Sequence, residues 1–261
     1  MTVGGIFSAE PQKKEKDTPP LVITVLHEPS ECEPFLVVDK PSGLPSAPLR
    51  EGDDSALTQA MSLFPEIAAV HGKKAVERGL IHRIDTATRG CVLIATSQAS
   101  YDFLSDAQAE GRFIKSYLAK VDRLSAESYD GFPPPPLDYG KIALGKPFVV
   151  ESRFRGYGKK GREVRPVTFQ SGMAALKKSD TTLYRTEITL QDTETALCRI
   201  SAGYRHQVRC HLAWLGLPVK NDVLYNPLCK DRAEGVLSFS AISLEFPLPM
   251  TGEPYAIRLG K

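Results

Sequence analysis

The chain has 261 residues, of which 42% are hydrophobic and 25% charged, as in ordinary soluble globular proteins. Lys and Arg number 33 against 31 Asp and Glu, so the net charge of +2 excludes a strongly basic protein, and nucleic-acid binding would have to come from local patches. No signal peptide and no apolar run of about 20 residues is present, which predicts a cytoplasmic protein without a membrane span. The five cysteines form no CxxC pair, which indicates buried, reduced thiols rather than disulfides or a zinc site.

The first part of the chain predicts a flexible tail followed by strands. Residues 1–20 are rich in Gly, Pro, Lys and Glu and have no hydrophobic periodicity. Residues 21–27 and 35–39 are β-branched runs separated by turn residues, which predicts two strands. Residues 55–64 then predict a helix, with Ser55 as its N-cap.

The central landmark is a polar turn between two apolar runs. Residues 80–84 look extended, and residues 91–95 are typical of a fully buried strand. The turn between them holds Arg83, Asp85 and Arg89, where a rigid scaffold can fix a loop side chain in place. Taken alone, Asp85 is better explained by an Asx turn, in which its carboxylate accepts a hydrogen bond from the backbone two residues on.

The elements after this turn alternate between helix and strand. Residues 97–110 predict a helix capped by Ser97 or Ser100, and residues 113–121 alternate as a strand does. Tyr117 on that strand fits either a half-buried sheet position or a stacking platform for a base. Among the later segments, residues 183–190 and 196–200 predict paired strands.

Two unusual segments lie between these strands. The proline run 132–136 fits a spacer better than a ligand for a proline-recognising module. Residues 153–165 carry six cations around three glycines and are the best patch in the chain for a phosphate backbone, as a mobile loop. An exposed basic hairpin is the alternative interpretation of this stretch.

Residues 203–216 predict an amphipathic helix that ends at a glycine. Arg205 and Arg209 are four residues apart, so on a helix they would repel each other, and an acidic partner or an anionic ligand is expected. His206 and His211 are five residues apart, which excludes a metal site of the HExxH type. His211 is best explained as a packed helix histidine.

Four stretches carry motifs, in chain order residues 38–44, 82–88, 115–119 and 203–215. Together they resemble the RluA-type family of RNA pseudouridine synthases. The first stretch resembles the family's Asp-Lys-Pro-x-Gly motif and the second its motif around the catalytic aspartate. The third resembles its Lys-x-Tyr-x-Ala motif and the fourth its His-Gln-Ile-Arg motif.

The resemblance implies an α+β fold, with a mixed, largely antiparallel central sheet, flanking helices and a catalytic cleft. It implies one catalytic domain over residues 21–261, with no separate S4-like RNA-binding domain before it. The implied activity converts specific uridines to pseudouridine in structured RNA, either rRNA or tRNA. We expect a monomer that needs no cofactor and no metal ion.

The resemblance also implies roles for individual residues. Asp85 is expected to attack the ribose or to remove a ribose proton, and the sequence does not choose between these. Arg209 is expected to pair with Asp85 and keep it ionised, while Tyr117 stacks on the flipped uracil and assists the final proton removal. Arg83 is expected to help extrude the base. Further contacts to the substrate are expected from His82, Arg205, His206 and Gln207.

This chain departs from the family pattern at a few positions. Arg89 stands where the family usually has Ser, Tyr204 and Arg205 replace an Arg-Thr pair, and Ser240 replaces a His. Asn221 and Asn226 occupy glycine positions, and Asn tolerates the left-handed conformation that such turns need. These departures affect substrate choice more than catalysis.

Three functions from other classes stay open. A non-catalytic RNA-binding protein or RNA chaperone would use the same cleft without turnover. A nucleoside hydrolase would release free uracil, although no second carboxylate is apparent at glycosidase-like positions. An interaction module would depend on the proline run.

Overall fold

The computed structural model describes residues 19–50, 52–124, 131–229 and 235–260. Most of the predicted tail, residues 1–18, lies outside the described residues. The four α-helices described are α1 (Ala56–Leu63), α2 (Gln98–Ala109), α3 (Met173–Lys177) and α4 (Gln207–Trp214). The ten strands described are β1 (Thr24–His27), β2 (Phe35–Lys40), β3 (Arg89–Ala95), β4 (Ile114–Lys120), β5 (Pro147–Tyr157), β6 (Glu163–Val167), β7 (Tyr184–Leu190), β8 (Thr195–Ile200), β9 (Phe239–Pro247) and β10 (Pro254–Arg258).

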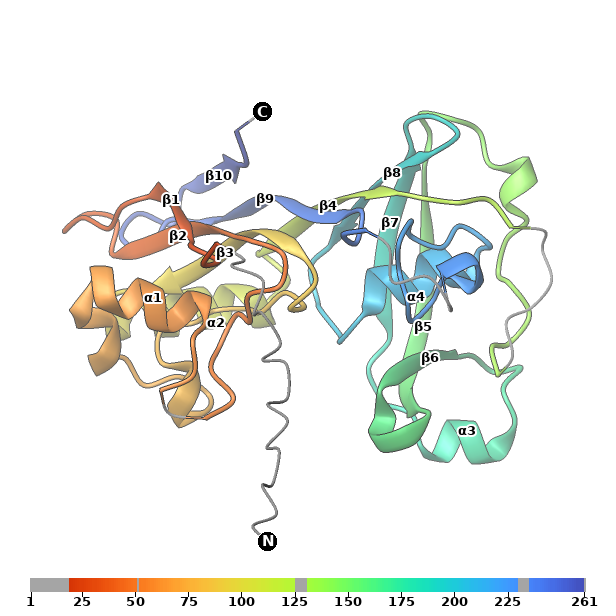
Figure 1. Ribbon diagram of the computed structural model, residues 1–261, viewed down its shortest axis with the longest axis horizontal. Coiled ribbons are helices and arrows are strands. Elements are labelled where there is room, and N and C mark those ends of the chain that lie inside the picture. The colour runs from red at the N-terminus through yellow and green to blue at the C-terminus, as the bar shows by residue number, and fades with distance from the viewer. Residues whose placement is uncertain (1–18, 51, 125–130, 230–234, 261) are drawn as a thin grey trace, which may run out of the picture.

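All ten strands join one sheet in the order β1-β2-β3-β9-β4-β8-β7-β5-β6, with β10 paired to β9. Among the described strands only β3 and β9 pair in parallel, so the sheet is mixed and largely antiparallel, as predicted. Figure 1 shows β4 and β9 running between two groups of elements. One group holds β1 to β3 with α1 and α2, and the other holds β5 to β8 with α3 and α4.

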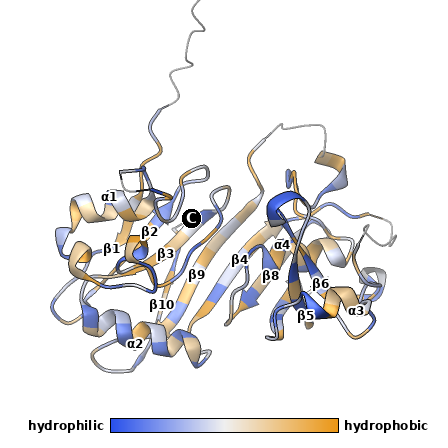
Figure 2. Ribbon diagram, turned by 90° about the horizontal axis from the view of Figure 1, so that it is seen from below, coloured by the Kyte–Doolittle hydropathy of each residue, from blue (hydrophilic) through white to orange (hydrophobic). Residues whose placement is uncertain are grey.

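Helices α1 and α2 cover opposite faces of the sheet around β3. Val92 and Ile94 pack with Leu57 of α1, whereas the alternate residue Leu93 packs with Leu104 of α2. Because successive side chains of a strand point to opposite faces, a continuous apolar run fills both layers. Figure 2 shows the two helices on either side of these strands. The buried strand that residues 91–95 predict is therefore confirmed.

Local signals predicted the first two helices correctly. Ser55 forms a capping box with Thr58, in which each side chain accepts a hydrogen bond from the other residue's backbone N–H. Ser97 caps α2 by accepting a hydrogen bond from the backbone N–H of Ser100, which resolves the choice between the two serines. Gly111 follows α2 with a left-handed φ of 75°, which a glycine adopts without strain.

Residues 80–84, which look extended in the sequence, pair with β3 only at their start. Leu80 makes a single isolated bridge to Ile94, and beyond it a side chain takes the place of the backbone ladder. The backbone N–H of Leu93 donates to Nε2 of His82 at 3.2 Å, so no carbonyl oxygen is needed there. The chain is thereby free to turn away from β3 and carry Asp85 into a loop.

Residues 153–165 form a hairpin rather than a mobile loop. Arg155 of β5 lies opposite Arg165 of β6, and a 3₁₀ turn over Lys159–Gly161 joins the strands. The guanidinium of Arg165 is buried 4.5 Å from the ring centres of both Tyr157 and Phe132. The backbone is therefore that of a basic hairpin, with Lys159, Lys160 and Arg162 exposed at its turn.

Helix α4 begins at Gln207, four residues later than the pattern predicted. His206 has a left-handed backbone, with φ 57° and ψ 13°, so the right-handed helix cannot extend back through it. Arg205 therefore lies outside the helix and is not a helical neighbour of Arg209. His211 is fully buried and contacts Ser152 and Thr186, as expected for a packed histidine.

The unusual residues of the sequence have structural partners. Arg89 donates two hydrogen bonds to the carboxylate of Asp39. Asn221 adopts the expected left-handed φ of 63°, but Asn226 does not, and its side chain instead donates to Asp122. The proline run accepts hydrogen bonds from the indole N–H of Trp214, which fits a packed spacer.

All five cysteines lie in the described part of the chain and are free, and three of them are buried. No helix within the described ranges is long and apolar enough to span a membrane.

Candidate active site

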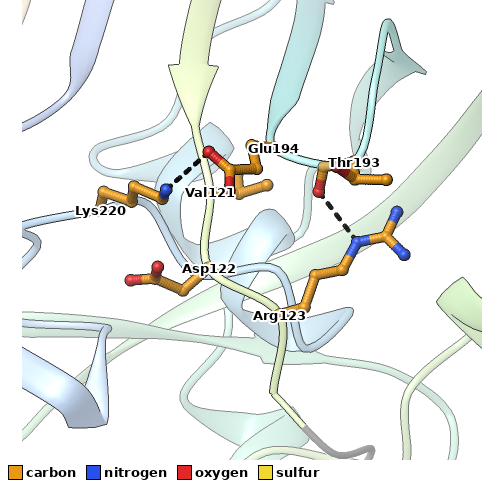
Figure 3. Close-up of a pocket in the computed structure, with 6 residues that line it drawn as sticks. All are labelled: Val121, Asp122, Arg123, Thr193, Glu194 and Lys220. Carbon is orange, nitrogen blue, oxygen red and sulfur yellow. Dashed lines mark hydrogen bonds and ion pairs between the residues drawn. The ribbon is translucent and has the colours of Figure 1, made fainter.

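A small pocket of about 170 Å³ is lined by cations that already have partners (Figure 3). Lys220 bonds Glu194 at 2.9 Å, and Nε of Arg123 donates to the carbonyl of Thr193 at 2.9 Å. Because these cations are paired, the pocket is a poor ligand site.

The main cleft is much larger, at about 1370 Å³, and shares no lining residue with that pocket. Its wall is built from the loop after residue 80, from β4 and from the start of α4. Every site residue predicted from the sequence lines it, namely His82, Arg83, Asp85, Tyr117, Arg205, His206, Gln207 and Arg209. Segments more than 100 residues apart in the chain thus converge, and Asp85 and Arg209 are separated by 124 positions.

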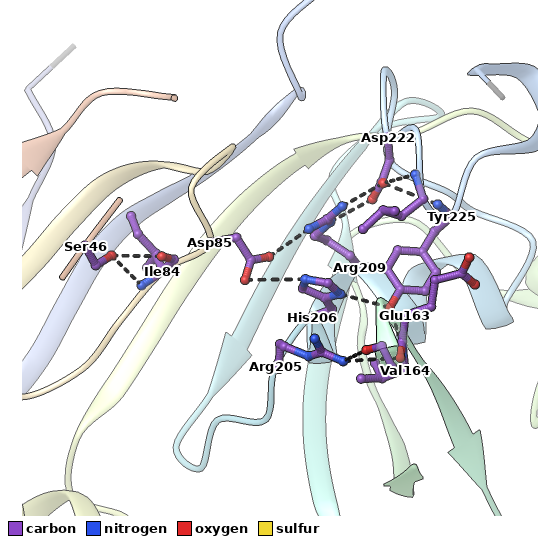
Figure 4. A network of polar contacts seen from close by, with 12 residues as sticks. Ser46, Ile84, Asp85, Glu163, Val164, Arg205, His206, Arg209, Asp222 and Tyr225 are labelled. Atoms are coloured by element: carbon purple, nitrogen blue, oxygen red, sulfur yellow. Dashed lines mark hydrogen bonds and ion pairs between the residues drawn. The ribbon is translucent and has the colours of Figure 1, made fainter. Parts of the chain in front are cut away.

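Asp85 is held at the centre of this cleft by a cation (Figure 4). Nη1 of Arg209 donates to Oδ2 of Asp85 at 2.8 Å, which is the pair that the sequence predicted. The other oxygen, Oδ1, lies 3.8 Å from Nε2 of His206. The Asp85 side chain is 24% exposed, so one face of the carboxylate stays open to a ligand.

Arg209 is itself fixed by a carboxylate that sequence reasoning missed. Its Nε and Nη2 each donate to Asp222 at 2.7 Å, in a two-point pairing, and Asp222 is fully buried. Burial alone would lower the pKa of the Arg209 guanidinium, but Asp222 and Asp85 raise it above its ordinary value. Arg209 therefore has two acidic partners, Asp222 and Asp85. The sequence analysis expected an acidic partner but did not point to Asp222.

His206 is oriented by a buried tyrosine. The hydroxyl of Tyr225 accepts the backbone N–H of Val164 at 2.9 Å, which leaves its own hydrogen to donate to Nδ1 of His206 at 3.1 Å. Burial lowers the pKa of His206 to about 4, against the opposing charge of Asp85, so the ring is neutral at pH 7. We assign the single ring hydrogen to Nε2, where it faces the carboxylate of Asp85.

The loop that carries Asp85 is anchored by a buried lysine. Nζ of Lys40 donates to the carbonyls of Leu44 at 2.6 Å, Pro41 at 2.9 Å and Thr86 at 3.2 Å. Burial lowers the pKa of Lys40 to about 8, while the charges of Asp85 and Asp39 oppose this shift. The lysine of the first motif therefore connects two loops, a role that the sequence did not indicate.

Two serines and a glycine complete this anchor. Ser46 Oγ donates to the carbonyl of Ile84 at 2.8 Å and accepts its N–H at 3.2 Å. Ser42 Oγ donates to the carbonyl of Ala87 at 2.7 Å, and the N–H of Gly43 donates to Thr86 at 2.7 Å. The backbone on both sides of Asp85 is therefore held by residues 42–46.

Tyr117 lies on the cleft wall with one ring face covered. Phe239 stacks on it with ring centres 5.0 Å apart and an angle of 7° between the planes. A ligand in the cleft could therefore stack only on the opposite face, and Tyr117 is 7% exposed. Burial, followed by the charge of Asp85, raises the pKa of Tyr117, so the phenol stays protonated at neutral pH. This supports the predicted stacking role more than the predicted role in proton removal.

Four predicted substrate contacts have structural partners of their own. Gln207 accepts the N–H of Tyr204 at 2.9 Å and donates to the carbonyl of Arg185 at 3.0 Å, so both ends of its amide are used. Arg205 donates to the carbonyls of Gly161 and Glu163 at the hairpin tip. In the same way His82 accepts the N–H of Leu93, and Arg83 lies 3.2 Å from Glu77. Of these four, Arg83 and Arg205 are exposed, whereas His82 and Gln207 are buried.

The sequence profile of the family described as RNA pseudouridylate synthase matches residues 34–214, which include the aspartate loop, β4 and α4. The chain belongs to this family. Among the described residues, no group of three His, Cys, Asp or Glu side chains is placed to hold a metal ion.

Relatives of this family are similar over most of the chain. The tRNA pseudouridine(31) synthase of Saccharomyces cerevisiae is 28% identical over 203 residues, or 75% of this chain. The chain spans 45% of that relative's length. The dual-specificity RNA pseudouridine synthase RluA of Escherichia coli is 28% identical over 193 residues, or 73% of each protein. The structure of human RNA pseudouridylate synthase domain containing 1 shares the fold, with a TM-score of 0.63, 17% identity and coverage of 95% of this chain and 86% of that one.

Proposed function

We propose that this protein isomerises uridine to pseudouridine in structured RNA, either rRNA or tRNA, and that Asp85 is the catalytic carboxylate. The reaction breaks a C–N glycosidic bond, turns the uracil and forms a C–C bond to the same ribose carbon, so it needs no redox cofactor. Residues 21–261 act as one catalytic domain, because the sheet is continuous across both groups of elements. The protein acts as a monomer in the cytoplasm.

The observation that carries the proposal is the placement of Asp85. Its carboxylate lies in a large cleft, paired through one oxygen with Arg209 and open on another side. The ion pair orients the carboxylate, as attack on the ribose or removal of its proton requires. Tyr117 on the same wall can stack on a base turned out of its helix, through the ring face that Phe239 does not cover.

The basic hairpin supports an RNA substrate. Lys159, Lys160 and Arg162 are exposed at its turn, and Arg162 also lines the cleft. Figure 2 shows hydrophilic residues along β5 and β6. Cations at the rim of a cleft attract phosphates and hold a strand over the site. Arg205 bonds this turn to the loop that carries His206, so the hairpin is tied to the catalytic site.

Replacing Asp85 by asparagine tests the function directly. The change keeps the shape of the side chain, so we expect an intact fold and RNA binding but a loss of turnover of at least about 10³-fold. Purified protein is assayed by tritium release from RNA labelled at uridine C5, because C5 loses its hydrogen when it joins the ribose. In cells, pseudouridine is mapped with the intact gene, without it and with Asp85→Asn.

Asp102→Asn on α2, outside the cleft, is the matched control and is expected to behave as the wild type. Loss of one defined pseudouridine in both altered strains supports the enzyme. Full turnover by Asp85→Asn contradicts the role of Asp85. Tight RNA binding by the wild type with no turnover on any RNA favours the non-catalytic RNA-binding protein.

Replacing Tyr225 by phenylalanine is expected to reduce kcat about tenfold with little change in KM. The change removes the donor that places the His206 hydrogen on Nε2, facing Asp85. It also leaves the buried N–H of Val164 without its acceptor, which lowers the free energy of unfolding by about 1–2 kcal/mol. Nitrogen NMR of His206 checks the tautomer, and single-turnover kinetics give the rate.

The control for Tyr225→Phe is Tyr255→Phe. The Tyr255 hydroxyl also contacts Nδ1 of a histidine, His27 at 3.4 Å, but lies outside the cleft. We expect it to leave kcat unchanged. An unaltered tautomer and rate in Tyr225→Phe would show that Tyr225 has a purely structural role.

A further inference from the structure

Lys115 is a buried cation in the wall of the cleft. It lies on β4 two residues before Tyr117, so both side chains point to the same face, and both line the cleft. The residue is only 4% exposed. None of the roles assigned above uses it.

Among the residues that the structure describes, no carboxylate pairs with Lys115. Its Nζ lies 5.1 Å from the ring centre of Phe113, and a Cβ added at Gly203 would lie 3.3 Å from Nζ. His82 packs edgewise on the same Phe113 ring, and burial together with Lys115 lowers the pKa of His82 well below its ordinary value. The neutral ring accepts the N–H of Leu93 at Nε2, so Nδ1 holds the hydrogen and offers no acceptor.

Within the described ranges Lys115 has neither a hydrogen bond nor an ion pair, in contrast to the other buried cations of the site. Lys40 donates to three carbonyls, and Arg209 pairs with two carboxylates. Lys73 adds a second cation to the same cleft, and its charge acts with burial to lower the pKa of Lys115 to about 8. A buried ammonium without a carboxylate partner destabilises the free protein, and a bound anion would offset this.

We propose that Lys115 forms a subsite for one phosphate of the RNA strand, next to the nucleotide whose base stacks on Tyr117. The proposal rests on the proposed function, because it takes the strand that carries the target uridine as the ligand. Two residues of a strand span about 6–7 Å, which places the cation within one nucleotide of the stacked base.

Neutral linkages in a short RNA test this subsite. The probe is a single-stranded adenosine oligonucleotide with one central uridine, prepared with natural phosphates or with one methylphosphonate at each position in turn. For the wild-type protein, we expect one linkage that flanks the uridine to reduce affinity about tenfold when it is neutral. Lys115→Met is expected to bind the natural RNA about tenfold more weakly than the wild-type protein does. The neutral linkage should not weaken the binding of this variant any further. Its salt dependence should correspond to about one phosphate contact fewer.

Lys120→Met is the control, because it removes a lysine from the same strand outside the cleft. It should retain the sensitivity of the wild type to the neutral linkage. Equal binding of natural and neutral oligonucleotides by the wild-type protein, at whatever affinity, overturns the proposal without any variant. A Lys115→Met protein that still loses tenfold at the same linkage also overturns it.

Thermal unfolding separates this role from a structural one. Because Lys115→Met removes an unpaired buried charge, we expect its Tm to rise by about 2–6 °C, whereas loss of a structural contact would lower it. Tritium release by the wild-type protein from transcribed RNA is measured in parallel. If binding depends on one linkage but no turnover occurs, the proposed function is refuted and the phosphate subsite stands. If turnover occurs but binding does not depend on any one linkage, the subsite is refuted and the proposed function stands.

Discussion

Replacing Arg209 by methionine is expected to abolish turnover and to lower the free energy of unfolding by about 3–5 kcal/mol. The change leaves Asp222, which is fully buried, without the guanidinium that satisfies both of its oxygens. It also removes the donor that pairs with Asp85 and orients it. Chemical denaturation measures the stability, and tritium release measures the turnover.

A double variant separates these two effects. Arg209→Met with Asp222→Leu removes both buried charges, so most of the lost stability should return, because an apolar pair of similar volume replaces a buried ion pair at little net cost. Turnover should stay lost, because Asp85 still has no partner. Recovery of turnover together with stability would show that Arg209 acts on the fold alone.

Replacing Lys40 by methionine is expected to lower kcat about 10²-fold and the free energy of unfolding by about 2 kcal/mol. Its ammonium connects the carbonyl of Leu44 to the carbonyl of Thr86, directly after Asp85. Without it the carbonyls of Pro41 and Leu44 lose this donor, Thr86 keeps only the N–H of Gly43, and the loop that carries Asp85 can shift. Single-turnover kinetics with saturating enzyme measure the chemical step.

Ser42→Ala is the control for Lys40→Met. It removes one exposed hydrogen bond, from Ser42 to the carbonyl of Ala87, and should change kcat less than about threefold. A Lys40→Met variant with lowered Tm but wild-type kcat would show that this anchor does not position Asp85.

The elements with strong local signals were predicted correctly. The capping residues Ser55 and Ser97 satisfy donors within their own first turn, so the helix starts can be read from a few neighbouring residues. The continuous apolar run of β3 predicted a strand buried on both faces. The resemblance implied the pair of Asp85 and Arg209, and the structure places these residues in contact.

Two features could not be read from the neighbouring residues. Residues 80–84 looked extended, but the sequence did not show that the side chain of His82 accepts the backbone N–H of Leu93 in place of a carbonyl. The helical pattern from residue 203 extended through Arg205, but the left-handed backbone of His206 ends it. Neither the hydrogen bond between His82 and Leu93 nor the left-handed backbone of His206 can be predicted from the periodicity of nearby residues.

The sequence by itself determined the family, the order of the motifs, the buried strand beside the aspartate and the need for an acidic partner of Arg209. The tertiary structure decided that Asp222 is a partner, that Lys40 holds the aspartate loop and that Lys115 is left without a counter-ion. The reason is physical. Hydrophobic periodicity and capping depend on neighbours within a few positions, whereas the charge balance of a cleft depends on side chains brought together from segments far apart in the chain.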